Sequence, residues 1–274
     1  MKHQKIGFIG AGNMARSLAS GLLANGWEKD NVVLSDPDSR QRDAIETTLG
    51  LKVYDDNTAL IEQVKTVVLA VKPQVLKGVV NQIAPAIQKH KPLVISIAAG
   101  VRIADLEHIL GEDIAIVRSM PNTPALIGSG ASGLFANQNT KPAQRDAAES
   151  ILRACGITVW VKSEDLLDVV TALSGSGPAY FFLVMEALER AAIDQGLDSD
   201  SARLLTLETA YGAAKMALEG GENPAQLRQR VTSPGGTTEQ AINILTIRGI
   251  HESFSEAIAA AVKRSKELAD MFGR

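Results

Sequence analysis

Lys5-Ile6-Gly7-Phe8-Ile9-Gly10-Ala11-Gly12-Asn13-Met14-Ala15 is the strongest structural signal in the first part of the chain. It reads as a short apolar strand, a tight turn and the start of a helix. Gly10 permits the turn, Gly12 lets the backbone approach a pyrophosphate, and Ala15 replaces a third glycine where helix and strand pack closely. Because the first turn of a helix presents free amides to anions, the stretch predicts a dinucleotide site. The alternative is a glycine turn used only for packing.

The residues around this turn repeat the alternation of strand and helix. Thr66–Val71 is continuously apolar after its first residue, as expected for a parallel strand that is buried on both faces. Helical patterns such as Asn13–Asn25 and Ala143–Ala154 lie between the strands. The expected strands are Ile6–Ile9, Val32–Leu34, Thr66–Val71, Leu93–Ile97, Ile114–Ser119, Ser132–Ala136 and Thr158–Val161. The pattern predicts a doubly wound α/β domain of the Rossmann type.

The pattern changes near Lys162-Ser163, after which only helices are expected. We therefore predict a dinucleotide-binding domain over 1–163 and an all-α domain over 164–274. The expected helices are 165–173, 177–195, 200–219, 224–231, 238–247 and 251–272. The helix 177–195 is apolar nearly all round, which is typical of a buried helix. It is either the central helix of one domain or a helix that packs partly against another subunit.

Asp36 follows the second strand, at the position where an acid binds the adenosine ribose hydroxyls of NAD. The same acid would repel the 2′-phosphate of NADP. Ser35 and Arg40 are close enough in sequence to help with a phosphate, so the choice between NADH and NADPH stays open. A third reading is that Asp36 caps the following helix.

Three further loops follow strand C-termini, where ligands bind in such sheets. Lys72 can reach a phosphate or ribose, or be a solvated loop lysine. Asn122 can bond the nicotinamide amide or the substrate, and a structural role between its flanking prolines is the main rival. The expected cofactor-binding residues are Ile9, Gly10, Ala11, Gly12, Asn13, Met14, Ser35, Asp36, Ala70, Val71, Lys72, Pro73, Ala98, Ala99 and Gly100.

A second anion receptor is expected at Ser233-Pro234-Gly235-Gly236-Thr237-Thr238, which precedes a helical pattern. Its glycines expose backbone N–H groups and its hydroxyls add donors, so neutral dipoles would hold a carboxylate. Thr237 and Gln240 have capping-box spacing, so a well-capped turn is the rival reading. The loop 174–180 also begins a helix, with Pro178 in the first turn and Ser176 or Gly177 as the cap. This loop, including Ser176, either contacts the ligand or acts as a helix hinge.

Composition and residue types narrow the chemistry. The net charge of −3 does not favour nucleic acid or an anionic membrane as a partner, and no apolar run reaches the roughly 20 residues of a membrane span. The single Cys155 fits a reducing compartment, so we expect a cytoplasmic protein. The four histidines are scattered, with surface positions favoured, and no metal site is expected. Hydride transfer, for which a cofactor supplies the chemistry, is the favoured reaction.

These segments together resemble pyrroline-5-carboxylate reductase over essentially the whole chain. The matching segments are Phe8–Ala15, Val71–Pro73, Ser96–Gly100, Met120–Pro124, Ser174–Tyr180 and Val231–Thr238. The last two, in this order, are specific to the family. The resemblance implies NADPH- or NADH-dependent reduction of 1-pyrroline-5-carboxylate to L-proline, the last step of proline biosynthesis.

The resemblance also implies an assembly and roles for residues. Family members join a Rossmann domain to a helical dimerisation domain, form homodimers and often decamers, and have the active site at the dimer interface. The substrate carboxylate would lie on Ser233, Gly235 and Gly236, beside Thr237, and the imine nitrogen would face Thr238. Asn57 matches an asparagine near the adenosine of the cofactor.

Two other functions are compatible with parts of the sequence. A β-hydroxyacid dehydrogenase also joins a Rossmann domain to helices, but it needs a catalytic lysine, for which Lys215 is only a loose candidate. A nicotinamide-sensing or scaffolding protein would bind the cofactor without oxidising it.

Overall fold

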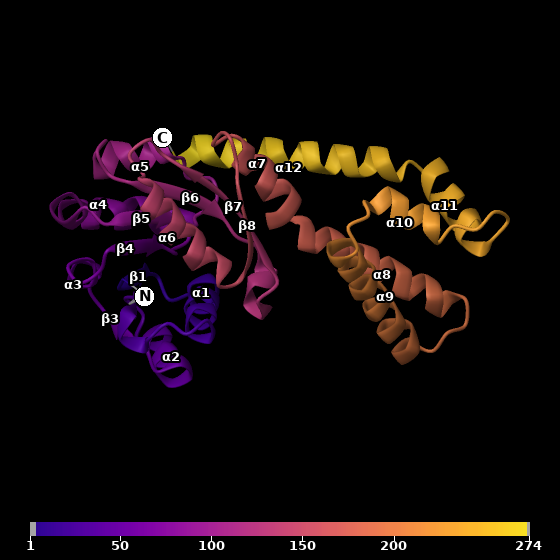
Figure 1. Ribbon diagram of the computed structural model, residues 1–274, viewed down its shortest axis with the longest axis horizontal. Helices are drawn as coiled ribbons and strands as arrows, with labels where there is room; N and C mark the ends of the chain where they lie inside the picture. Colours follow the sequence, from indigo (N-terminus) through magenta and orange to yellow (C-terminus); the bar gives the residue numbers. More distant parts are fainter. Residues whose placement is uncertain (1–3, 273–274) are drawn as a thin grey trace. The chain divides into compact units, whose positions relative to one another are not determined.

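The computed structural model describes residues 4–272, and it divides into two compact units. The first unit contains the chain up to Ser176 together with the end of the chain from Ala260, and the second unit is Gly177–Ala259. Figure 1 shows the strands in the first unit and helices α8 to α11 in the second. The units are described separately below.

The first unit is built on one sheet of eight strands in the order β3-β2-β1-β4-β5-β6-β7-β8. Its strands are β1 (Ile6–Ile9), β2 (Val32–Ser35), β3 (Lys52–Tyr54), β4 (Thr66–Leu69), β5 (Leu93–Ser96), β6 (Ile116–Met120), β7 (Gly130–Ala136) and β8 (Gly156–Trp160). Neighbouring strands are parallel except β6 and β7, which are antiparallel. All seven predicted strands are present. The sequence pattern missed β3, because it is three residues long and its Lys52 is exposed.

Helices cover both faces of this sheet, and each face has its own hydrophobic core (Figure 1). Residues of α1 (Asn13–Ala24), α2 (Ser39–Leu49) and α6 (Pro142–Arg153) contribute to one core. Residues of α3 (Asn57–Ile61), α4 (Pro73–His90) and α5 (Ile103–Leu110) contribute to the other. The predicted doubly wound Rossmann-type domain is therefore confirmed.

The end of the chain belongs to the first unit. Helix α12 (Ile250–Phe272) contributes Ser265, which donates a buried hydrogen bond of 2.6 Å to Asp168 Oδ1 of α7 (Leu166–Val170). The buried Ala269 of the same helix lies against Gly100, where an added Cβ would be 3.5 Å from the Ala269 backbone. The polar and apolar contacts together fasten the last part of the chain to this unit.

The second unit is entirely helical, as predicted. Its helices are α8 (Gly177–Asp194), α9 (Ser199–Glu219), α10 (Pro224–Arg230), α11 (Thr237–Ile247) and the first part of α12. Helices α8 and α9 pack against each other. By length and composition alone, the helical segment Leu166–Asp194 resembles one membrane span, with a mean hydropathy of 1.3. Only 22% of that apolar window is buried in the single chain, so most of its surface lacks a partner there.

The predicted start of a helix at 177 is confirmed, but the residues directly before it, which were expected to form a loop, are helical. Thr171–Gly175 forms a π-helical turn that follows α7 directly, and α8 begins at Gly177. The amide of Ser176 donates to the Thr171 carbonyl at 2.8 Å, which is the i to i+5 bond of a π-helix. The two glycines of this segment suggested a break, but hydrogen bonding outweighs their low helix propensity.

Candidate active site

The first candidate site is a cavity of about 420 Å³ in the first unit. It lies at the C-terminal ends of β1, β2 and β4, as expected for a doubly wound sheet. The predicted residues that line it are Ile9, Gly10, Gly12, Asp36, Asn57, Ala70, Val71 and Lys72. Sequence reasoning did not single out Pro37, Gln41, Asp55, Val75, Val79 and Gln82, which also line it. Pro37 directly follows the predicted Asp36, and Gln41 directly follows Arg40, so neighbouring positions were the available signal for these two residues.

The two glycines of the N-terminal turn have different structural roles. Gly10 has φ +98°, and a Cβ there would lie 2.8 Å from the Ala70 carbonyl oxygen, so the fold itself requires glycine. Gly12 has φ −71°, and a Cβ there would meet nothing within 4 Å. It is the N-cap of α1, with no side-chain cap bond. The open space above Gly12 and the uncapped helix start fit the pyrophosphate of a dinucleotide.

Asp36 connects the glycine turn to the end of β2. Its Oδ2 accepts from the Ala11 amide at 2.8 Å, and its Oδ1 accepts from the Asp38 amide at 2.9 Å. The suggestion that Asp36 caps the following helix is wrong, because Asp38 caps α2 by accepting from the Arg40 amide. Asp36 is thus a positioned carboxylate in the wall of the cavity, where the sequence places the adenosine ribose.

Ser35 is fully buried, and its hydroxyl donates to Asn57 Oδ1 at 2.7 Å. The hydroxyl therefore orients Asn57, which lines the cavity, and it does not point at a phosphate. Arg40 is not among the lining residues. Arg42 donates to the carbonyls of Asp36 and Pro37, both at 2.9 Å, so it stabilises the backbone of the loop after β2 that lines the cavity.

The other predicted cofactor residues are not among those that line the cavity. Asn13 and Met14 are the first residues of α1, and Pro73 is the first residue of α4. Ala98, Ala99 and Gly100 follow β5, and Gly100 has φ +73° where it lies against α12.

Asn122 has its whole side-chain amide engaged by the protein. Its Nδ2 donates to the Ser174 carbonyl at 3.2 Å and to Ser174 Oγ at 3.1 Å. Its Oδ1 accepts from the Ala131 amide at 2.9 Å. These bonds tie the loop after β6 to β7 and to the π-helical turn, which is the structural role that the sequence left open. Ser176 lies directly after that turn and is half-buried.

The second candidate site is the loop Ser233–Gly236 and the first turn of α11, in the second unit. The predicted capping box from Thr237 to Gln240 is wrong. Gly236 is the N-cap, and no side chain caps it. Glu239 reaches back instead, and its Oε2 accepts from the Gly235 amide at 2.9 Å. The Gly236 amide donates to the Ser233 carbonyl at 3.0 Å.

The remaining donors of this loop are open. Within the described part of the chain, the amides and hydroxyls of Thr237 and Thr238 and the hydroxyl of Ser233 have no hydrogen-bond partner. Gly235 has φ +71°, and a Cβ there would meet nothing within 4 Å, so its surface is also accessible. Neutral donors at an uncapped helix start are suited to an anionic ligand.

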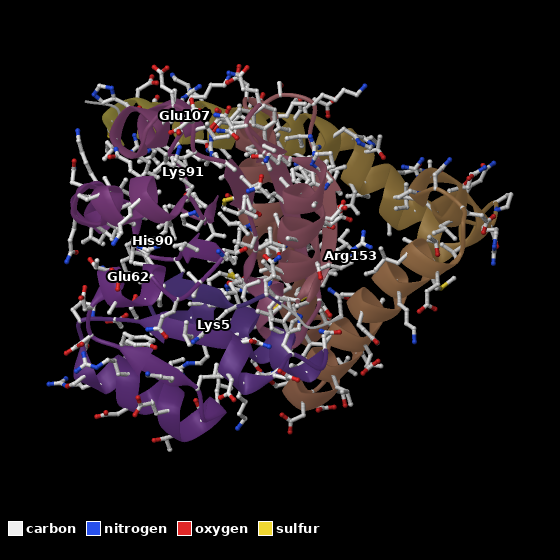
Figure 2. The ribbon with its side chains drawn as sticks, turned by 60° about the vertical axis from the view of Figure 1, so that its left-hand side comes forward. Lys5, Glu62, His90, Lys91, Glu107 and Arg153 are labelled. Carbon is white, nitrogen blue, oxygen red and sulfur yellow. The ribbon has the colours of Figure 1, made fainter. Side chains whose placement is uncertain are left out.

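Many titratable groups of the first unit are not among the residues that line the cavity. Figure 2 labels Lys5, Glu62, His90, Lys91, Glu107 and Arg153, none of which lines the cofactor cavity. Among the described residues, no group of three or more His, Cys, Asp or Glu side chains is placed to hold a metal ion. His108 and His251 are exposed, as predicted, His90 is half-buried, and His3 lies outside the described residues.

Two protein-family models match separate parts of the chain. Residues 5–100 match the family NADP oxidoreductase coenzyme F420-dependent, and residues 164–268 match pyrroline-5-carboxylate reductase dimerisation. The first match covers the glycine turn and the cavity, and the second covers the loop 233–238.

Full-length relatives share one name. The chain is 47% identical to pyrroline-5-carboxylate reductase of Pseudomonas aeruginosa over 100% of both chains. A solved structure of such a reductase from Coxiella burnetii has 47% identity and a TM-score of 0.94, with 97% of this chain and 98% of that chain covered. The Plasmodium falciparum enzyme, solved with NADP bound, has 32% identity and a TM-score of 0.86, with 98% and 99% covered.

The predicted family, fold and enzyme class are thus confirmed, and the dehydrogenase and sensor readings are set aside. The chain belongs to the pyrroline-5-carboxylate reductase family, NAD(P)H-dependent oxidoreductases that reduce 1-pyrroline-5-carboxylate to L-proline in the last step of proline biosynthesis.

Proposed function

We propose that the loop Ser233–Thr238 binds the carboxylate of 1-pyrroline-5-carboxylate and that Thr238 acts on its ring nitrogen. The observation that carries this proposal is the set of open donors at the start of α11, on an accessible glycine turn without a side-chain cap. Ser233 and the amides of Gly235, Gly236 and Thr237 are assigned to the carboxylate. The Gly235 amide becomes available only when the Glu239 carboxylate leaves it.

Thr238 is assigned as the catalytic residue. It is half-buried at the second position of α11, and its hydroxyl has no partner within the described residues. Hydrogen bonding to the imine nitrogen would polarise the C=N bond and make its carbon a better hydride acceptor. Threonine is a weak acid, so the proton that the nitrogen gains comes ultimately from solvent. Holding the imine in one orientation supplies most of the remaining rate enhancement.

The cofactor is assigned to the cavity of the first unit. When bound, NADH or NADPH supplies the hydride, two electrons pass to the imine carbon, and the oxidised cofactor and L-proline are the products. Gly12 and the amides that begin α1 would hold the pyrophosphate, and Asp36 would face the adenosine ribose. Lys72 lines the same cavity and would contact a phosphate or ribose.

The dimerisation domain makes the protein a homo-oligomer that acts on a small molecule. We assign the domain limits 1–163 to cofactor binding and 164–274 to dimerisation and substrate binding. Phe181, Phe182 and Leu183 of α8 are 67%, 64% and 65% exposed in the single chain, and we assign this face to contact with a second copy rather than with lipid. A decamer of five dimers, in the cytoplasm and without nucleic-acid or membrane partners, is the assembly we propose.

Two substitutions test these assignments. Thr238→Ala should lower kcat by about 10²–10³, since loss of one oriented donor costs this much at comparable sites, while leaving the Kd for NADPH unchanged. Ser233→Ala should mainly raise KM for the imine. Steady-state oxidation of NADPH with 1-pyrroline-5-carboxylate measures both, and wild-type kinetics in Thr238→Ala would remove Thr238 from the mechanism.

A further inference from the structure

Among the described residues, Glu239 is the one whose side chain occupies a donor assigned to the substrate, while the Ser233 carbonyl occupies the Gly236 amide. Its Oε2 lies 2.9 Å from the Gly235 amide nitrogen. A carboxylate oxygen on a backbone N–H is the same chemical contact that a substrate carboxylate would make. Glu239 therefore makes at this amide the contact that the substrate carboxylate would make.

This contact differs from a capping box. Glu239 is the third residue of α11, where a capping-box side chain would accept from the N-cap amide, here Gly236. The Gly236 amide is already used by the Ser233 carbonyl, and Glu239 passes it to reach Gly235. Gly235 contributes no side chain to obstruct a second carboxylate, and the space beside it is open.

The Glu239 carboxylate also has an alternative partner available in the same unit. It lines a cavity of about 430 Å³ between α10 and α11, together with Arg228, Gln229 and Asn243. Within the described residues, the Arg228 guanidinium has no ion-pair or hydrogen-bond partner. If Glu239 is displaced, its carboxylate would leave the neutral Gly235 amide and pair with the Arg228 guanidinium, which lines the same cavity.

Resting on the proposed carboxylate site, we infer that Glu239 is an intramolecular competitor of the substrate. Its carboxylate accepts from the Gly235 amide and turns toward Arg228 when the imine carboxylate docks. Competition weakens the binding of substrate and of product, because both present a carboxylate to the same amide. Glu239 is thus a residue that sets affinity and speeds product release, and it takes no part in hydride transfer.

Kinetics with L-proline as the binding probe test this inference. Glu239→Ala should lower KM for 1-pyrroline-5-carboxylate and the product-inhibition constant of L-proline, each about fivefold, with kcat no higher than in the wild type. Glu239→Gln keeps a weaker, neutral acceptor, so it should lower both constants by a smaller factor than Glu239→Ala. If the alanine variant fails to fold, the glutamine variant tests the inference in its place. Glu256→Gln removes an exposed acid from α12 of the same unit and should change neither constant.

Arg228→Ala provides a second, independent readout. It should raise KM in the wild-type background, because Glu239 then has no alternative partner, and have no effect on KM in the Glu239→Ala background. If Glu239 only supports the loop, Glu239→Ala will raise KM or leave it unchanged, which overturns the inference. The proposed site fails separately, through normal kinetics in Ser233→Ala and Thr238→Ala.

Discussion

Replacing Gly10 and Gly12 by alanine separates a glycine that the fold needs from one that the ligand needs. At Gly10, φ of +98° is unfavourable for alanine by about 1–2 kcal/mol, and the Cβ at 2.8 Å from the Ala70 oxygen adds about 1–3 kcal/mol of overpacking. Gly10→Ala should therefore lower the free energy of unfolding by about 2–5 kcal/mol. That is a large part of the 5–15 kcal/mol typical of a folded domain.

Gly12→Ala should leave the fold intact. Alanine adopts φ −71° without strain, its Cβ meets nothing, and the stiffer unfolded chain adds about 0.4–1 kcal/mol of stability. The same methyl group would stand where the pyrophosphate approaches. Losing two charge-assisted hydrogen bonds at about 1.5 kcal/mol each weakens binding by about 3 kcal/mol, or roughly a hundredfold in the Kd for NADPH.

Thermal unfolding and titration of NADPH fluorescence measure the two effects. Saturating NADPH at about 100 times Kd should stabilise the wild type by about 2.7 kcal/mol and should leave Gly12→Ala nearly unchanged at that concentration. Gly78→Ala, on the exposed side of α4 and with open space around it, is the matched control and should alter stability only. An unchanged Kd in Gly12→Ala would refute the assignment of the pyrophosphate to this turn.

Three further predictions concern single side chains. Asp36→Ser should raise the ratio of kcat/KM for NADPH to that for NADH at least about tenfold, because a carboxylate repels the 2′-phosphate; an unchanged ratio would show that Asp36 is not the discriminator. Ser265→Ala should lower the free energy of unfolding by about 1.5–3 kcal/mol in a denaturant melt, because buried Asp168 loses its donor, whereas exposed Ser255→Ala should not. Burial raises the pKa of the Cys155 thiol above its usual 9.0, so the thiol should resist iodoacetamide in the native protein. The stability that the buried neutral thiol contributes is complete below pH 9.0 and is lost as pH rises through the higher native pKa. Thermal unfolding measured at a series of pH values above 9 will detect this loss.

Much of the first unit could be predicted because its signals are local. The apolar run Thr66–Val71 and the turn Gly10–Gly12 specify a buried parallel strand and a strand-to-helix turn without reference to distant residues. Lys52–Tyr54 was missed because its pairing with β2, rather than its own composition, makes it a strand. The antiparallel direction of β7 likewise depends on how the chain returns to β6.

The site was less predictable at the level of hydrogen bonds. The sequence analysis singled out Ser35 and Asn122 near functional segments, but it did not show what their side chains contact, and it did not single out Glu239. Ser35 is bound to Asn57, and Asn122 is bound to residues 9 and 52 positions away. Such partners depend on tertiary packing, which the spacing of residues in one segment does not encode.

The fastening of α12 to the first unit has a consequence for synthesis on the ribosome. The Ser265–Asp168 bond and the contact of Ala269 with Gly100 need residues that are translated after the second unit. The nascent cofactor domain can therefore form its sheet early, but it stays without its final helix until the whole second unit has been made and released. Translation stalled before residue 260 would yield a chain with the glycine turn complete and the buried carboxylate of Asp168 lacking its donor.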